Sequence, residues 1–414
     1  MSGNEQQMNL ALESIVLQNL SMMTCLFVGP KNLVSLQNLT KLTIAECEKL
    51  KIVFSTSTVR CLPQLLHMGI EECKELKHII EDDLENKKSP NLMSATKTCF
   101  PKLKALSVIK CNKLKYVFPI SICRELPKLR SLMIREADEL EEIFVSEGDD
   151  LESKKPSNFM STTKTRFPKL EYLAVVKCNK LNHVFPISIC KELPELYDLR
   201  IEECNELSHI IEDDLESKKP SNSMSTTKTC FPKLSCLAVV KCNKLNHVFP
   251  ISICKEFPEL YDLRIEECNE LRHIIEDDLE NTTKTCFPNL SKLVVLKCNK
   301  LKYVFPISIC KELPELKALI IREADELDEI FANEGDDHKV EIPNLQFVVF
   351  ENLLSLCHAQ GIQFQAVKHR FIQNCPKLSL ASASTADFRL DVFDLFRYGT
   401  HYPIFLKLLH VGCK

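Results

Sequence analysis

The chain has 414 residues and a formal net charge of −4, which excludes the basic surface expected of a protein that binds nucleic acid or anionic membranes. Its 8 glycines are too few and too scattered for a phosphate-binding loop or a nucleophile elbow. No H-E-x-x-H pattern occurs, and no stretch approaches the roughly 20 apolar residues of a membrane span. We therefore expect no catalytic, cofactor-binding or metal-binding residues, and no enzyme activity.

Cysteine is unusually frequent, with 21 residues. The segment 1–13 has neither the basic start nor the continuous apolar stretch of a secretory signal. We therefore expect a cytoplasmic protein, in a reducing compartment where thiols stay free.

The chain is a series of internal repeats. Residues 167–214 and 231–278 align without gaps over 48 positions and differ at only four. Each large repeat holds two units, F-P-x-L-x-x-L-x-V-x-x-C-N-K-L followed by L-P-x-L-x-x-L-x-I-x-x-C-x-x-L. About thirteen units follow one another, and they begin near Leu12, Leu39, Leu65, Leu103, Leu129, Leu170, Leu196, Leu234, Leu260, Leu290, Leu316, Leu345 and Val367.

Each unit predicts one short strand, because its apolar residues alternate through the middle of the motif. A single unit cannot bury its apolar edge, so stacked units should form one parallel sheet. The V-F-P-I-S-I-C stretch after each first-unit strand predicts a short convex turn or helix near Pro186, with Phe185 and Ile189 pointing inward. The fold class expected is an α/β repeat solenoid, a horseshoe with the parallel sheet on its concave face and an irregular or short-helical convex side.

Polar stretches interrupt the array after several second units. They lie near 81–98, 147–165, 212–229 and 276–285, and they differ in length between otherwise similar copies. We interpret them as flexible insertions into a single solenoid over 1–380. Residues 381–414 leave the pattern and are interpreted as a cap or an off-pattern tail.

The repeat motif resembles the leucine-rich repeat, L-x-x-L-x-L-x-x-N/C-x-L, in register at about a dozen places over roughly residues 10–380. More narrowly, segments such as 39–54 and 193–211 resemble the repeat region of plant coiled-coil-class NB-ARC–LRR disease-resistance proteins. The resemblance implies recognition of a pathogen effector or a guarded host protein, together with autoinhibition of a nucleotide-binding module. No coiled coil or nucleotide-binding module occurs in the 414 residues, so we expect a fragment of a longer receptor or a truncated gene product. A substrate adaptor for ubiquitin ligation stays open as the alternative.

The repeated cysteines and histidines have a structural interpretation. Nine cysteines share one repeat position, which Ala137 and Ala324 occupy in two other units, and a metal ligand would not be replaced by alanine. We predict a buried ladder of small side chains. Histidine and tyrosine interchange at a second position, as at His183 and Tyr116, which indicates a half-exposed aromatic slot.

The strand residues that flank the inward Leu and Val or Ile should face solvent on the concave side. First units there are mostly apolar and second units charged, so we predict a striped face that binds a protein partner. The alternative is that the side chains of this face only stabilise the sheet, through their own cross-strand pairs. The candidate partner-binding residues are Arg135, Tyr172, Asp198, Arg200, Glu202, Asp262, Arg264, Glu266, Lys292 and Arg322.

Overall fold

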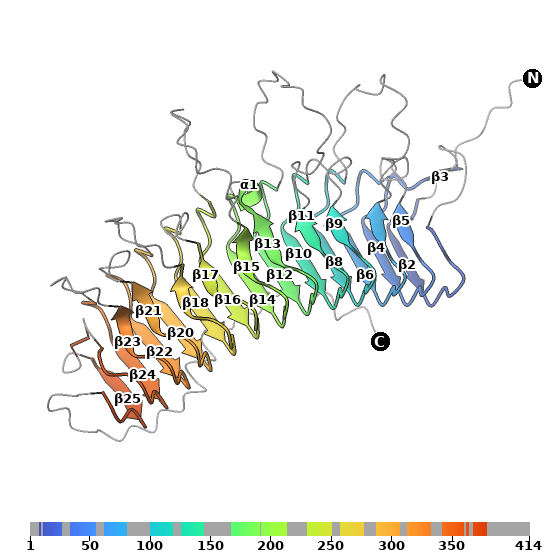
Figure 1. The fold of residues 1–414 in the computed structure, drawn as a ribbon. Coiled ribbons are helices and arrows are strands. Elements are labelled where there is room, and N and C mark those ends of the chain that lie inside the picture. The colour runs from blue at the N-terminus through green and yellow to red at the C-terminus, as the bar shows by residue number, and fades with distance from the viewer. Residues whose placement is uncertain are drawn as a thin grey trace, which may run out of the picture.

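Thirteen long strands lie side by side in one parallel sheet that curves along its length, as the computed structural model shows (Figure 1). The order follows the chain: β2 (Ser14–Gln18), β4 (Lys41–Ala45), β6 (His67–Glu71), β8 (Ala105–Ile109), β10 (Ser131–Arg135), β12 (Tyr172–Val176), β14 (Asp198–Glu202), β16 (Cys236–Val240), β18 (Asp262–Glu266), β20 (Lys292–Leu296), β22 (Ala318–Arg322), β24 (Phe347–Glu351) and β25 (His369–Gln373). Each predicted unit start lies two residues before one of these strands.

The structure describes residues 8–9, 11–26, 34–54, 62–80, 100–118, 126–144, 167–190, 192–212, 230–250, 257–276, 287–306, 313–332, 342–359, 362–363 and 367–378. The predicted insertions at 81–98 and 147–165 and the tail 381–414 lie outside these residues. So do the insertions near 212–229 and 276–285, apart from their first residues, Glu212 and Glu276.

Shorter strands form parallel pairs on the other side of each coil. They are β5 (Ile52–Phe54) with β7 (His78–Ile80), β9 (Tyr116–Phe118) with β11 (Glu142–Phe144), β13 (His183–Pro186) with β15 (His209–Glu212), β17 (His247–Phe249) with β19 (His273–Ile275), and β21 (Tyr303–Pro306) with β23 (Glu329–Ala332). A further two-residue pair joins β1 (Met8–Asn9) and β3 (Val34–Ser35).

Helix is nearly absent from the described residues. One short helix, α1 (Ile187–Cys190), begins directly after Pro186, as expected for one copy of the V-F-P-I-S-I-C stretch. Phe185 and Ile189 are buried there, as predicted. In the other copies the I-S-I-C part lies outside the described residues, and the V-F part belongs to the short strands β9, β17 and β21. A parallel-strand solenoid is therefore confirmed, whereas the α/β assignment and a helical convex side are not.

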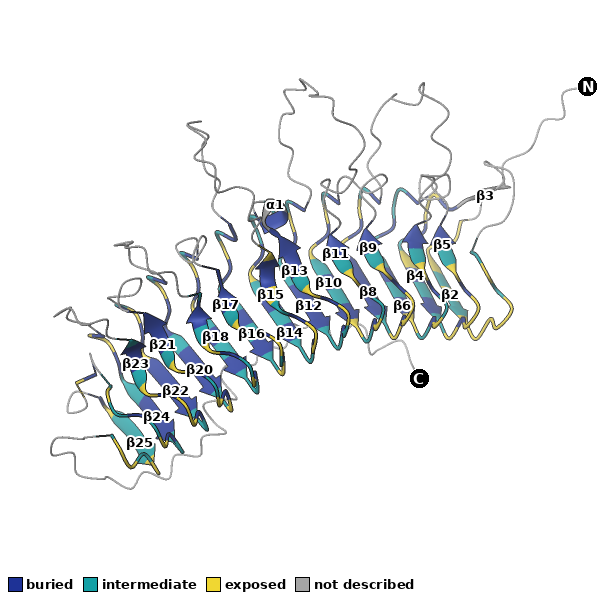
Figure 2. Cartoon of the chain, in the orientation of Figure 1, coloured by how far each residue is buried: buried dark blue, intermediate teal, exposed yellow. Residues whose placement is uncertain are grey.

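The core lies between the two layers of strands and follows the repeat spacing. In β14, Leu199 and Ile201 are buried while the residues beside them are partly exposed, and Figure 2 shows such banding along the long strands. The phenylalanines of the F-P and V-F pairs pack between coils, with ring centroids 5.0 Å apart for Phe185 and Phe231. Alternating burial on one face is what the two-residue period of a strand requires.

The cysteine ladder is buried, as predicted, in eight of its nine units, and Cys375 is partly exposed. Each thiol donates a weak hydrogen bond to the backbone carbonyl two residues earlier, as Cys204 does to Glu202 at 3.4 Å. Burial raises the pKa of the Cys242 thiol well above its usual range. All cysteines in the described ranges are free thiols, so this position serves packing rather than crosslinking.

The aromatic slot lies at the start of the short strands. His247 follows His209, with ring centroids 5.5 Å apart, and His273 packs against Tyr303 at 4.7 Å. Burial lowers the pKa of His247; Glu276 opposes this shift, and the neighbouring His209 and His273 add to it. The slot is therefore a row of tilted rings in contact, and at His247 it favours the neutral imidazole.

Candidate protein-binding surface

Thirteen strands in register arrange their outward side chains in columns. The first, third and fifth residues of each long strand point away from the core, and parallel pairing aligns each column, as in Asp198 beside Cys236 and Asp262. At about 4.8 Å per strand, the sheet is on the order of 60 Å long. We call the outward side of this sheet, formed by the first, third and fifth residues of each long strand, the concave face.

All ten predicted residues lie on the concave face. They are Arg135 at the end of β10, Tyr172 at the start of β12, Asp198, Arg200 and Glu202 on β14, Asp262, Arg264 and Glu266 on β18, Lys292 at the start of β20, and Arg322 at the end of β22. The central strands bring most of them together: β14 and β18 are charged and flank the small residues of β16. Arg135 and Arg322 are farther along the sheet.

The arginines are paired with carboxylates on the same face. The Nε of Arg200 donates to Oε1 of Glu202 at 2.6 Å, and Arg264 and Glu266 repeat this pair two strands on. Arg322 pairs with Glu351 of the next strand. Pairs this exposed contribute roughly 0–1 kcal/mol each to stability. Their stronger effect is to hold the guanidinium groups in fixed positions on the face.

The two aspartates at the start of β14 and β18 have different neighbours. The Nζ of Lys292 lies 3.2 Å from Oδ2 of Asp262. In the described residues, no hydrogen bond or ion pair reaches the carboxylate of Asp198, which lies between Tyr172 and Cys236. Burial raises the pKa of Asp198 from 3.8 to about 6; Arg200 opposes this shift and Asp262 adds to it.

The apolar part of the concave face is less exposed than predicted. Val294, Ile320 and Val349 occupy the same position on β20, β22 and β24 and are buried, with Leu296 and Phe371 packed against them. The expectation that such residues face solvent is wrong here. In-register apolar side chains on successive strands cover one another. This row stabilises the sheet and leaves little apolar surface for a partner.

Sequence reasoning missed the turn that follows each long strand. Its first residue has a positive φ in every coil, for example 52° at Glu267 and 54° at Lys297. Lysine and glutamate alternate at this position from β6 to β22, a row that we call the charge ladder: Glu72, Lys110, Glu136, Lys177, Glu203, Lys241, Glu267, Lys297 and Glu323. Glu267 lies within ion-pair distance of both Lys241 and Lys297, at 3.9 and 3.5 Å.

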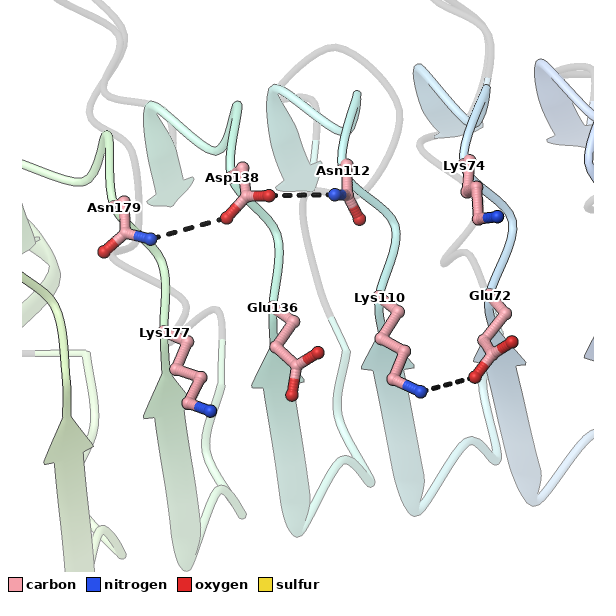
Figure 3. A pocket seen from close by; sticks show the side chains of 8 residues that line it. All are labelled: Glu72, Lys74, Lys110, Asn112, Glu136, Asp138, Lys177 and Asn179. Atoms are coloured by element: carbon pink, nitrogen blue, oxygen red, sulfur yellow. Dashed lines mark hydrogen bonds and ion pairs between the residues drawn. The ribbon is translucent and has the colours of Figure 1, made fainter.

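An amide ladder runs beside the charge ladder, two residues further along each turn (Figure 3). Its side chains hydrogen-bond from coil to coil, and they are Asn112, Asp138, Asn179, Asn205, Asn243 and Asn269. Every amide donates toward Asp138, from Asn112 at 2.8 Å on one side and from Asn179 at 3.5 Å on the other. The two ladders line a groove of about 370 Å³.

The signal for both ladders was present in the repeats as K-C-N-K in first units and E-C-N-E in second units. Stacking the units places each lysine between two glutamates. The lysine and glutamate after the asparagine form a second set of pairs, such as Lys300 with Glu270 at 2.7 Å. The groove of Figure 3 is therefore lined by alternating charges and amides, and some of these are paired, as Lys110 is with Glu72.

Within the described ranges, no three His, Cys, Asp or Glu side chains gather as a metal site would require. The helices described there include none with the length and apolar character of a membrane span.

A curved solenoid with a long charged sheet face is the architecture of a leucine-rich-repeat protein-interaction domain. The family model for plant disease resistance protein RPS2-like leucine-rich repeats matches residues 1–74, 74–166, 158–205, 205–286 and 269–388. The chain therefore belongs to the plant RPS2-like disease-resistance leucine-rich-repeat family.

Several solved structures match the chain at low identity. The leucine-rich-repeat domain of the type III effector XopL is 19% identical with a TM-score of 0.44, over 68% of this chain and 79% of that one. TLR13 in its complex with ssRNA13 is 14% identical with a TM-score of 0.31, over 87% and 51%. The pneumococcal vaccine antigen PcpA is 12% identical with a TM-score of 0.19, over 92% and 82%. No curated protein sequence matches the chain. All three TM-scores are below 0.5, so the family assignment rests on the repeat sequence.

Proposed function

We propose that this chain is the recognition and autoinhibitory part of a plant intracellular immune receptor. It acts in the cytoplasm by binding a pathogen effector or a guarded host protein, and it carries out no catalysis. The nucleotide-binding module that such repeats hold inactive would belong to the same receptor. The family assignment and the free, buried cysteines support this proposal.

The observation that carries the proposal is the repeated charged strand. Asp198, Arg200 and Glu202 on β14 recur as the same three residues on β18, about 9.6 Å away across β16. Two identical charged rows at a fixed spacing suit a partner that contacts several strands at once. A small molecule would need an enclosed pocket, and the two grooves that lie along the ladders are open and lined with charged and amide side chains.

Charge reversal in these rows tests the proposal. Arg200→Glu and Arg264→Glu should weaken binding of the partner, or change signalling, when the repeats are part of the full receptor. Both side chains are partly exposed and outside the core, so the proteins should stay folded. Lys128→Glu is the matched control, because Lys128 is an exposed lysine away from the concave face.

The readouts are co-precipitation of the partner and receptor signalling in plant cells. If both arginine variants are folded and behave like the control, the concave face is not the recognition surface. Catalysis and nucleic-acid binding would then need separate assays.

A further inference from the structure

Asp198 stands out on the concave face because the chain contains its own comparison. Asp198 and Asp262 occupy the same place in two large repeats that differ at only four positions. Asp262 pairs with the ammonium group of Lys292, which lies in register with it on the following strand. The residue in register with Asp198 on its following strand is Cys236. Asp262 is therefore paired within the array through its Oδ2, although its buried Oδ1 has no partner, whereas neither oxygen of Asp198 is paired within the described residues.

The environment of Asp198 is poorly suited to an unpaired carboxylate. The residue is half-buried, with Tyr172 beside it on one strand and Cys236 on the other. The charged groups that face it are Arg200 on its own strand and, beyond Cys236, the paired Asp262 and Lys292. Arg200 already pairs with Glu202, and this pairing weakens the attraction between Arg200 and Asp198. An ionised Asp198 is therefore costly without a cation from outside the chain.

We propose that Asp198 anchors a lysine or arginine side chain of the protein partner. This side chain pairs with Asp198 in the way that Lys292 pairs with Asp262. The site is the concave face over β12, β14 and β16, with the Tyr172 ring as one wall and the small Cys236 leaving room for the cation. This inference rests on the proposed function and names the chemistry that the partner supplies.

The small side chain on β16 is the second part of the argument. Cysteine at position 236 leaves the space that a lysine fills at position 292. The wall beside it is aromatic, and a cation near a tyrosine ring gains further attraction. The two residues that flank Asp198, Tyr172 and Cys236, thus differ from those that flank Asp262, Cys236 and Lys292, and both differences favour an external cation at Asp198.

The decisive variant is Cys236→Lys, which copies the Asp262–Lys292 pair onto Asp198. The new lysine should occupy the carboxylate and compete with the partner. Cys236→Ser is the matched control, because it removes the thiol without supplying a charge. Asp198→Asn removes the anchor while keeping its size, and we expect it to be at least as stable as the original chain at neutral pH.

A random displayed peptide library is the probe, selected on the whole chain at neutral pH. We expect peptides with one invariant lysine or arginine whose affinity falls about tenfold or more in Asp198→Asn and Cys236→Lys and is unchanged in Cys236→Ser. Replacing the invariant basic residue of the peptide by norleucine should lower its affinity for the original chain by the same factor. It should not lower the affinity for Asp198→Asn any further. Calorimetry near pH 6 should show proton release on binding in the original chain only, because the cation favours the ionised carboxylate.

Circular dichroism and urea unfolding establish that each variant is folded before binding is compared. Peptides without an invariant basic residue, a selection that returns no Asp198-dependent binder, or equal affinity in Asp198→Asn would each overturn the proposal. The concave-face function is separate: if Arg200→Glu and Arg264→Glu weaken receptor recognition while Asp198→Asn and Cys236→Lys do not, only the Asp198 site is wrong.

Discussion

Replacing Glu267 by asparagine should change the free energy of unfolding in two opposite ways, because it relieves backbone strain and removes ion pairs of the charge ladder. Glu267 has a φ of 52°, and an L residue in this left-handed region costs about 1–2 kcal/mol relative to glycine. Asparagine tolerates the region better and occupies the same place in three other coils, at Asn19, Asn352 and Asn374. Relief of backbone strain should therefore contribute roughly 0.5–1 kcal/mol of stability.

The substitution also removes two ion pairs, with Lys241 at 3.9 Å and Lys297 at 3.5 Å. All three side chains are about 40–50% exposed, so each pair contributes roughly 0.2–1 kcal/mol at low salt. We expect Glu267→Asn to be nearly neutral at about 0.01 M salt, where the Debye length is near 30 Å. At about 1 M salt the pairs are screened, and the variant should be more stable by about 0.5–1 kcal/mol.

The assay is urea unfolding at both salt concentrations, with hydrogen exchange of peptides from β18 and β20 to report the local opening free energy. Glu270→Asn is the matched control, because Glu270 has an ordinary φ and pairs with Lys300 at 2.7 Å. The control should lose up to about 1 kcal/mol at low salt and nearly nothing at high salt. The reasoning is refuted if Glu267→Asn is destabilising at high salt, or if both variants respond alike.

Three further predictions concern the core and the rings. Leu199→Ala should destabilise the array by roughly 2–5 kcal/mol in urea unfolding, because Leu199 is 1% exposed; a loss below about 1 kcal/mol would mean that the coil closes the cavity. The buried Cys204 thiol should react slowly with a maleimide in the native protein and quickly after unfolding, and fast native labelling would contradict the ladder. The pKa of His247 is lowered in the folded state, so protonation favours unfolding and stability should fall as pH drops below about 6.5. The His247→Tyr variant should lose less stability over this pH range. An unchanged pH profile of stability in this variant would exclude His247 as the source of the loss.

The repeat spacing predicted the long strands because burial alternates with a period of two. Because Cys204 and Leu207 turn inward, the side chains of Leu199 and Ile201 must also point into the core. The strand position therefore follows from the motif alone. The same logic placed the ten candidate residues on the concave face. What each of them contacts did not follow, since that depends on the residue in register on the next strand.

Two outcomes show this limit. Val294 was expected to be exposed, but Ile320 on the next strand covers it, and no pattern within one unit contains that neighbour. Asp198 and Asp262 are identical in local sequence, yet only Asp262 meets a lysine. The left-handed turn was missed for another reason: lysine and glutamate stand where glycine or asparagine would have signalled a positive φ.

The alternation of lysine and glutamate imposes a parity rule on the length of the array. Loss or gain of one coil between β6 and β22 would bring two lysines or two glutamates together along the turn, and like charges at this spacing repel. Loss or gain of two coils keeps every cation between anions. The near-identical segments 167–214 and 231–278 each span two coils. A gene that duplicates this segment thus lengthens the concave face by about 9.6 Å and keeps its electrostatic register.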